Sequence, residues 1–397
     1  MTLSGRRVVL GVSGGIACYK ACSLARRLTQ QGASVEVVLT AAAREFVGPV
    51  TFEALTGRPA VTSLWDPGVA LDHVRLAHDP DLIVIAPATA NVLARASQGI
   101  ADDFLTALLL AADIPVLAAP AMNDDMYERE TTRENIDRLR ARGWTMLGPA
   151  TGPLAEGPSD RPGRMVEPDE ILAVVERTFG IGDSALAGRR VVVTAGATRE
   201  SIDPVRLITN RSSGRMGFEL ARRAWARGAD VTLITGPSQL APPFGVSVVE
   251  VESTSDLHDA VGRALPGTDV LVMAAAPADY RVENPAVEKR PRKEGALTVT
   301  LVPTPDILEG TRDRRKPGAV MVGFALETGD GVARARAKLE RKGLDLIVLN
   351  YANEDGAGFE TMTNRVTLIR ADGEESLPLL SKADVADRIL DAIEPGL

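Results

Sequence analysis

Hydrophobic and polar positions alternate along the chain between two kinds of segment. Short apolar runs, rich in Val and Ile, predict buried strands at residues 7–12, 34–40, 82–87, 116–120, 189–194, 229–235, 269–275, 320–325 and 344–349. Longer segments with apolar residues three and four positions apart predict crossover helices between them. This alternation is typical of parallel sheets covered by helices, so we predict an α/β fold with two doubly wound, Rossmann-like domains in tandem.

The two halves of the chain resemble each other. RRVVLGVSGG followed by LARRLTQQGASVEVVLT opens the first half, and RRVVVTAG followed by LARRAWARGADVTLIT opens the second. Each half therefore begins with its own strand, turn, helix and strand. Small, flexible residues, GIGDSALAG, lie between the halves. We predict domains at residues 1–180 and 189–397, joined by a linker at residues 181–188.

Composition narrows the possible functions. A chain of 397 residues with 45% hydrophobic content suits two globular domains. A formal net charge of -8 gives no field that attracts nucleic acid, so we expect no such partner. The two cysteines, Cys18 and Cys22, indicate a reducing compartment, and we expect the cytoplasm. The apolar runs are strand-sized, so no membrane association is expected.

Three motifs in the first half follow predicted strands: SGGIACYK at residues 13–20, APATAN at 86–91 and APAMN at 119–123. The carboxyl ends of parallel strands meet at one edge of a sheet, where a glycine turn and a helix N-terminus can bind an anionic ligand. Each motif alone is compatible with ordinary loop chemistry, but their joint placement favours a ligand site. His73 is a candidate acid or base, and a surface histidine is the alternative.

In the second half, NRSSGRMG at residues 210–217 places two serines and a glycine at a predicted helix start, a geometry that suits a triphosphate. Neither a Walker motif nor a dinucleotide fingerprint is present, which disfavours a dehydrogenase. Cations suit a phosphate-transfer transition state, and Lys289, Lys338 and Lys342 are candidates. Surface charge is the alternative, and we prefer it for the neighbouring Arg290, Arg292 and Lys293.

These motifs resemble known families. SGGIACYK, the HVRL histidine, PATAN, PAMN and GRM resemble, in order and spacing, the flavin-dependent cysteine decarboxylases. TAGATRESIDPVRLITNRSSGRMG, AAAPADYR, TPDIL and VGFALET resemble the phosphopantothenate-cysteine ligases. Their fusion, over nearly the whole chain, resembles the bacterial bifunctional decarboxylase and ligase family of coenzyme A biosynthesis.

The resemblance implies two consecutive reactions. The ligase domain would join 4'-phosphopantothenate to cysteine through an acyl-cytidylate, using CTP with Mg2+ and releasing CMP and pyrophosphate. The N-terminal, flavodoxin-like domain would then decarboxylate 4'-phosphopantothenoylcysteine to 4'-phosphopantetheine, with FMN transiently oxidising the thiol carbon. It also implies a homo-oligomer with flavin-domain trimers and ligase-domain dimers.

The resemblance assigns roles to residues of the first half. His73 corresponds to the active-site histidine and Asn123 to the asparagine that binds the substrate carboxylate. Better-known members carry a proton-donating lid cysteine ahead of GRM, where this chain reads PLAEGPSDRPGRM. Glu156 is a candidate replacement, and an exposed, solvating glutamate is the alternative. The expected FMN contacts are Ser13, Gly14, Gly15, Ile16, Thr40, Pro87, Ala88, Thr89, Ala90 and Asn91.

The resemblance also assigns roles in the second half. Asn210 would handle the acyl-nucleotide intermediate, Lys289 would act on the triphosphate, and Asp279 is a candidate Mg2+ ligand. The expected nucleotide site consists of Ser212, Ser213, Gly214, Met273, Ala274, Ala275, Asp279, Pro305, Asp306, Ile307, Leu308, Phe324, Lys338 and Lys342.

Two other functions remain open on the sequence. A flavin prenyltransferase-like enzyme shares the fold and the SGG turn, but it would need neither PAMN nor the second half. A flavoprotein that binds FMN and regulates partners without catalysis would also carry the first-half motifs. Release of CO2 and cysteine-dependent formation of CMP would distinguish them from the bifunctional enzyme.

Overall fold

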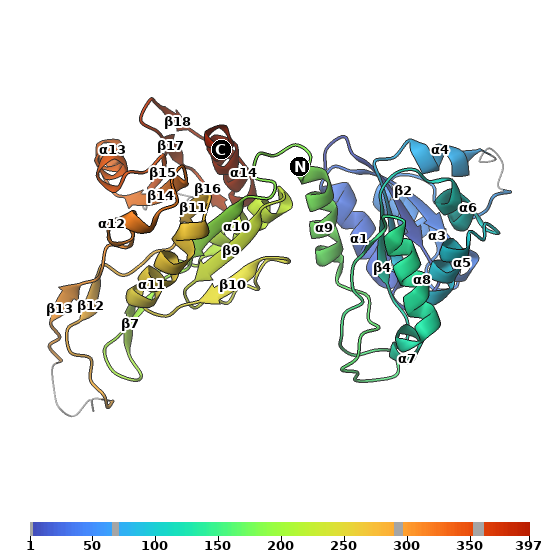
Figure 1. Cartoon of the computed structure of the whole chain (residues 1–397), viewed down its shortest axis with the longest axis horizontal. Helices are drawn as coiled ribbons and strands as arrows, with labels where there is room; N and C mark the ends of the chain where they lie inside the picture. The colour runs from blue at the N-terminus through green and yellow to red at the C-terminus, as the bar shows by residue number, and fades with distance from the viewer. Residues whose placement is uncertain (1–2, 66–70, 290–296, 352–360) are drawn as a thin grey trace. The chain divides into compact units, whose positions relative to one another are not determined.

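The chain folds as two α/β units. The computed structural model describes residues 3–65, 71–289, 297–351 and 361–397 (Figure 1). The units comprise Met1–Glu176 (unit 1) and Arg177–Leu397 (unit 2), and their boundary falls within helix α9, Pro168–Gly180. The predicted domain limits and the linker at residues 181–188 stay predictions. Among the helices of the described ranges, none is long and apolar enough to cross a bilayer.

Unit 1 is built on a five-stranded parallel sheet in the order β2-β1-β3-β4-β5, the flavodoxin-like arrangement. Its strands are β1 (Arg7–Val12), β2 (Ser34–Leu39), β3 (Leu82–Ala88), β4 (Val116–Pro120) and β5 (Thr145–Met146). The four predicted strands of this half begin and end within one residue of the observed ones. Strand β5 was not predicted, because a strand of two residues has no apolar run.

Helices cover both faces of this sheet. Helix α1 (Cys18–Gln30) contacts β1, β2, β3 and helix α3 (Pro49–Thr56), and its apolar side is buried. A second buried cluster joins the sheet to α4 (Asp72–His78), α5 (Ala90–Gln98), α6 (Phe104–Ala111) and α8 (Glu130–Ala141). Two short helices, α2 (Ala41–Arg44) and α7 (Asp124–Glu128), follow β2 and β4. They therefore start at the carboxyl edge, where a ligand site is expected.

Unit 2 contains an eight-stranded sheet in the order β10-β9-β6-β11-β14-β15-β17-β18. The strands are β6 (Arg190–Ala195), β9 (Asp230–Thr235), β10 (Ser247–Glu250), β11 (Val270–Met273), β14 (Val320–Glu327), β15 (Leu346–Tyr351), β17 (Thr367–Ile369) and β18 (Glu374–Ser376). The first six strands in this spatial order are parallel and follow the Rossmann order. Strand β17 pairs antiparallel with β15, and β18 pairs antiparallel with β17. Strands β10, β17 and β18 were not predicted, because they are short.

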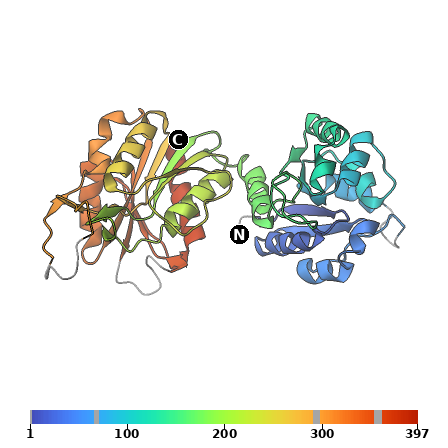
Figure 2. The same cartoon turned by 90° about the horizontal axis from the view of Figure 1, so that it is seen from below.

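Helices also cover both faces of the second sheet (Figure 2). One buried cluster includes α10 (Arg215–Ala226) and α14 (Lys382–Ile393), and the other includes α11 (Thr254–Ala264), α12 (Ile307–Gly310) and α13 (Gly331–Lys342). Three small antiparallel pairs were not predicted: β7 (Arg199–Ser201) with β8 (Leu207–Thr209), β12 (Tyr280–Val282) with β13 (Leu301–Pro303), and β16 (Thr363–Asn364) with β19 (Leu380–Ser381). Their strands have three residues or fewer.

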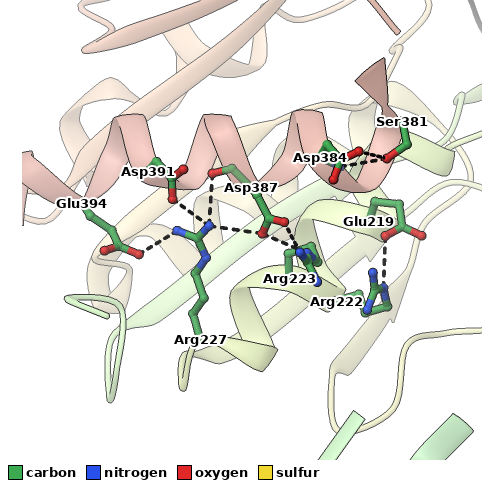
Figure 3. Close-up of polar contacts among 9 residues, drawn as sticks. All are labelled: Glu219, Arg222, Arg223, Arg227, Ser381, Asp384, Asp387, Asp391 and Glu394. Atoms are coloured by element: carbon green, nitrogen blue, oxygen red, sulfur yellow. Dashed lines mark hydrogen bonds and ion pairs between the residues drawn. The ribbon is translucent and has the colours of Figure 1, made fainter. Parts of the chain in front are cut away.

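Ion pairs join α10 and its C-cap residue Arg227 to α14 and its C-cap residue Glu394 (Figure 3). Arg223 Nε donates to Asp387 at 2.8 Å, and Arg227 pairs with Asp387, Asp391 and Glu394 at 3.1, 2.8 and 2.8 Å. The Arg223 side chain is only 8% exposed, so its charge needs a partner inside the interface. This network fixes the C-terminal helix against the helix that follows the NRSSGRMG loop.

Candidate active sites

The first site forms where the strand order of unit 1 reverses, between β1 and β3. Ser13 Oγ donates to the Pro87 carbonyl at 2.7 Å and accepts from the Thr89 N–H at 3.0 Å, which joins the ends of the two strands. A cavity of about 810 Å³ lies at these ends. Small-molecule sites occupy roughly 300–1,000 Å³, so there is room for a cofactor and a substrate together.

Most of the residues predicted for the flavin site line this cavity. They are Ser13, Gly14, Gly15, Ile16, Thr40, Thr89, Ala90 and Asn91, together with Asn123 and Glu156. Pro87 and Ala88 are outside the lining and lie in the buried end of β3. The roles of these residues stay predictions.

His73 lies outside the lining of this cavity. It belongs to α4, and its ring packs edge-on against Phe104 with the ring centroids 6.3 Å apart. Its Nδ1 atom is buried without a hydrogen-bond partner among the described residues. Within one chain, the structure therefore does not bring His73 together with Asn123 in the cavity.

The walls of the cavity suit a flat ring with a polar, phosphorylated tail. A Cβ added to Gly14 would lie 2.4 Å from the Cβ of Ala42, so glycine is needed for the SGG loop to approach the start of α2. Thr40 Oγ1 caps α2 by accepting from the Ala43 N–H at 3.2 Å. The N-terminus of α1 follows the SGG loop, which offers N–H donors for a phosphate. These residues fit FMN.

Residues 150–165, the lid, complete the cavity. Lid residues 153–156 and 163–165 line it, and Glu156 is exposed. Lys20, which sequence analysis did not single out within SGGIACYK, donates to the Met165 carbonyl at 2.9 Å and pairs with Glu167 at 2.9 Å. The hydrogen bond from Lys20 lowers the pKa of Glu167. The sequence did contain a signal for Lys20, because a lysine on the buried side of an amphipathic helix needs a partner.

The second site forms in unit 2 at the carboxyl ends of β11 and β14, the two strands next to the strand-order reversal at β6. A cavity of about 170 Å³ lies at the strand ends. The predicted residues that line it are Met273, Ala275, Asp279, Pro305, Asp306, Ile307, Leu308, Phe324, Lys338 and Lys342. Ala274 is not part of the lining, whereas Thr254 and Thr304, which were not predicted, contribute hydroxyls.

Two lysines line this cavity, together with Asp279 and Asp306. Lys338 Nζ donates to the Phe324 carbonyl at 2.7 Å, and Lys342 Nζ pairs with Asp306 at 2.7 Å. Burial, and then the positive charge of Lys342, lower the pKa of Lys338. An anionic ligand would offset both effects, so the site is suited to a phosphate group.

The NRSSGRMG loop lies next to this cavity. Asn210 Nδ2 donates to the carbonyls of Ala276 and Pro277 at 3.1 and 3.0 Å, and Pro277 lines the cavity. Gly214 begins α10 with a φ of 78°, and a Cβ there would come within 3.1 Å of the Gly196 nitrogen. The loop is therefore pressed against the end of β6. Ser212, Ser213 and Gly214 themselves are outside the lining.

The remaining predicted residues of unit 2 are exposed. Lys289 is exposed and outside the lining of the cavity. Arg290, Arg292 and Lys293 lie outside the described residues. Asp279 is exposed at the cavity, and no group of three His, Cys, Asp or Glu residues gathers as a metal site within the described ranges. Its role as a Mg2+ ligand stays a prediction.

Comparison with known proteins decides the family. Residues 1–180 match the flavoprotein family model, and residues 186–396 match that of the DNA/pantothenate metabolism flavoprotein C-terminal domain. The coenzyme A biosynthesis bifunctional protein CoaBC of Vibrio cholerae is 44% identical over 396 residues, which cover 99% of this chain and 98% of the relative. The chain belongs to the CoaBC family.

Two other CoaBC proteins are similar to this chain. That of Mycobacterium tuberculosis is 48% identical over 403 residues, covering 98% of this chain and 96% of the relative. A crystal structure of a CoaBC C-terminal domain is 39% identical and covers 54% of this chain and 97% of its own, with a TM-score of 0.46. Membership confirms the predicted fold class and the predicted bifunctional enzyme of coenzyme A biosynthesis, with decarboxylase and ligase activities.

Proposed function

We propose that unit 2 ligates 4'-phosphopantothenate to cysteine with CTP and Mg2+, and that unit 1 decarboxylates the product to 4'-phosphopantetheine with FMN. The observation that carries this proposal is the presence of two cavities, each at the carboxyl ends of the parallel strands of its own sheet, in one chain of the CoaBC family. The first is large and lined mainly by small residues and polar edges, and the second carries two lysines. We also propose that the enzyme is cytoplasmic, which its two free cysteines support.

In unit 1, loss of CO2 from an acylcysteine requires an electron sink, which FMN supplies when bound. Ser13, Gly14 and Thr40 would hold the cofactor against the wall that the SGG loop and the start of α2 form together. Asn123 would bind the substrate carboxylate. Its Oδ1 already accepts from the Asp125 N–H at 2.9 Å, which leaves its NH2 group to donate to a carboxylate. The lid would exclude water from the reacting carbon.

His73 would act across a subunit boundary. It lies outside the cavity of its own chain, and a homo-oligomer with trimers of unit 1 would place it at a neighbour's cavity. Exposed Leu71 and Val74 beside it on the surface support an interface there. The test is to mix inactive His73→Asn and Asn123→Ala subunits. Mixed oligomers should regain decarboxylation, whereas no recovery would contradict a shared site.

Glu156 is the proposed proton donor for the final reduction, because it lines the cavity where related decarboxylases carry a cysteine. Glu156→Gln should slow product formation and let an oxidised intermediate and reduced flavin accumulate during turnover, which the flavin absorbance would reveal. Unchanged turnover would discard this role and leave Glu156 as a solvating residue.

In unit 2, phosphate groups would bind between the NRSSGRMG loop and the lysines of α13. Lys338 and Lys342 would neutralise the charge that gathers on phosphate as the carboxylate attacks. Asp279 would share a Mg2+ ion with the phosphates, and Lys289 would reach the triphosphate from its exposed segment. Asn210, fixed by the Ala276 and Pro277 carbonyls, would position the acyl-cytidylate. Dimers of unit 2 are expected.

One incubation tests the proposal. The purified protein is given 4'-phosphopantothenate, cysteine, CTP and Mg2+, and the products are identified by mass. We expect the wild-type protein to form CMP and 4'-phosphopantetheine. The Asn123→Ala variant should form CMP and accumulate the intermediate 4'-phosphopantothenoylcysteine. A protein that stays colourless after FMN is added and leaves CTP intact would contradict the proposal.

A further inference from the structure

Five polar residues join the lid to α7: Asp124, Asp125, Glu128, Ser159 and Arg161, here called the Arg161 cluster. The Arg161 guanidinium pairs with the carboxylates of Asp124, Asp125 and Glu128 at 2.9, 2.8 and 2.9 Å. Ser159 Oγ donates to Asp124 at 2.6 Å and accepts from the Arg161 N–H at 3.1 Å. One lid arginine therefore binds every carboxylate of this short helix.

The cluster begins one residue after Asn123. The Met122 N–H, on the other side of Asn123, donates to the lid carbonyl of Gly163 at 3.0 Å. The chain is thus bound to the lid immediately before and immediately after the asparagine that would grip the substrate. A Cβ on Gly163 would come within 2.7 Å of the Met122 carbonyl, so the two segments are in close contact.

The cluster also lies between the two parts of the lid that line the cavity, residues 153–156 and 163–165. We propose that Arg161 is a positioning residue for decarboxylation: it holds the lid on α7, and thereby fixes the Asn123 amide and closes the cavity over the substrate. This inference rests on the proposed function of unit 1.

The charges around Arg161 explain why this one residue can hold the lid on α7. The Arg161 side chain is 41% exposed, so each ion pair alone contributes little. Without Arg161, however, three carboxylates would repel one another along a helix of five residues. The hydrogen bond from Ser159, together with the pairing with Arg161, lowers the pKa of Asp124 against the opposing effect of burial, so this carboxylate stays charged at neutral pH. Loss of Arg161 should loosen the lid and leave the sheet intact.

The test compares Arg161→Gln with Arg140→Gln. Arg140 is a matched control, because it is 49% exposed and pairs with Asp137 at 3.0 Å on α8. Hydrogen exchange of residues 150–166 measures the lid without reference to catalysis. Decarboxylation of 4'-phosphopantothenoylcysteine measures its effect, and ligation by the same chain reports on folding.

We expect Arg161→Gln to speed exchange at the lid amides, including the mutually bonded Leu154 and Gly157. Decarboxylation should lose about tenfold to a hundredfold in kcat/KM, mainly through a higher KM. Ligation, and both activities of Arg140→Gln, should stay within about twofold. Arg161→Lys should recover only part of the loss, because an ammonium cannot bridge several carboxylates as a guanidinium does.

Equal lid exchange in Arg161→Gln and Arg140→Gln would overturn the proposal, as would slower decarboxylation with unchanged exchange. If Arg161→Gln loses ligation as well, its fold is disturbed, and the double variant Asp125→Asn with Glu128→Gln replaces it in the test. This variant removes two ion pairs of Arg161 and keeps the pair with Asp124. Selective loss of decarboxylation there supports the proposal, and unchanged decarboxylation contradicts it. A wild-type protein that does not decarboxylate would instead refute the proposed function, while the exchange comparison still tests the cluster.

Discussion

Replacing Gly14 by alanine tests how the first cavity is built. The added Cβ would lie 2.4 Å from the Cβ of Ala42 and 2.5 Å from its carbonyl carbon. Carbon atoms in contact prefer about 3.5–4.0 Å, so the SGG loop and the start of α2 must separate by roughly 1 Å. Overpacking of this kind costs about 1–3 kcal/mol. A loss of about 2 kcal/mol would lower the Tm of a unit of this size by roughly 4–8 °C.

The next residue provides the control. A Cβ on Gly15 would meet Thr89 Cγ2 at 3.6 Å, an ordinary contact, so Gly15→Ala should change the Tm by less than about 2 °C. Calorimetry without added flavin measures both variants, and the transition of unit 1 is identified by its shift when FMN is added. Gly14→Ala should also bind FMN more weakly in a fluorescence titration. Equal Tm values for the two variants would refute the steric argument.

Three further predictions concern charge. The hydrogen bond from Lys20 lowers the pKa of Glu167 below its ordinary 4.5, so the stability it gives unit 1 is present above pH 4.5 and is lost as the pH falls through the lower value. Lys20→Met should abolish this acid sensitivity in denaturation measured stepwise with pH. Because the pKa of Lys338 is lowered, the KM for CTP should rise at alkaline pH, and Lys338→Gln should flatten that profile. In urea unfolding, Asp387→Asn should cost unit 2 about 1–3 kcal/mol, because it removes the partner of the buried Arg223. The control Arg222→Gln, whose 32% exposed side chain pairs with Glu219 within α10, should cost less than about 0.5 kcal/mol; equal losses would contradict the importance of the buried charge.

Local signals made much of the fold predictable. Runs of Val and Ile located nine parallel strands within two residues, because such runs fit buried parallel strands. The SGG loop was correctly predicted to line a cavity, because its glycines directly follow a predicted strand. Strands of two or three residues, such as β7 and β12, have no periodicity to detect, and only tertiary pairing reveals them.

Long-range contacts made the rest unpredictable. Arg161 meets Glu128 33 residues earlier in the chain, and no local pattern marks this pair. For His73, the motif was recognisable in the sequence, but its position could not be predicted. The fold of one chain places it outside the cavity. Lys20 stood inside a selected motif, yet its partners Met165 and Glu167 belong to a segment that only the folded chain brings near.

The two borders of the larger sheet carry a consequence for solubility. Its outermost strands, β10 and β18, have four and three residues, and each contains glutamate. All three residues of β18 are exposed, and two of them are acidic. A strand of another chain that paired with β10 or β18 would find few free backbone groups, and it would lie next to the negative charge of the glutamates. Association through open-ended sheet extension, the route to fibrils, is thereby discouraged at both borders.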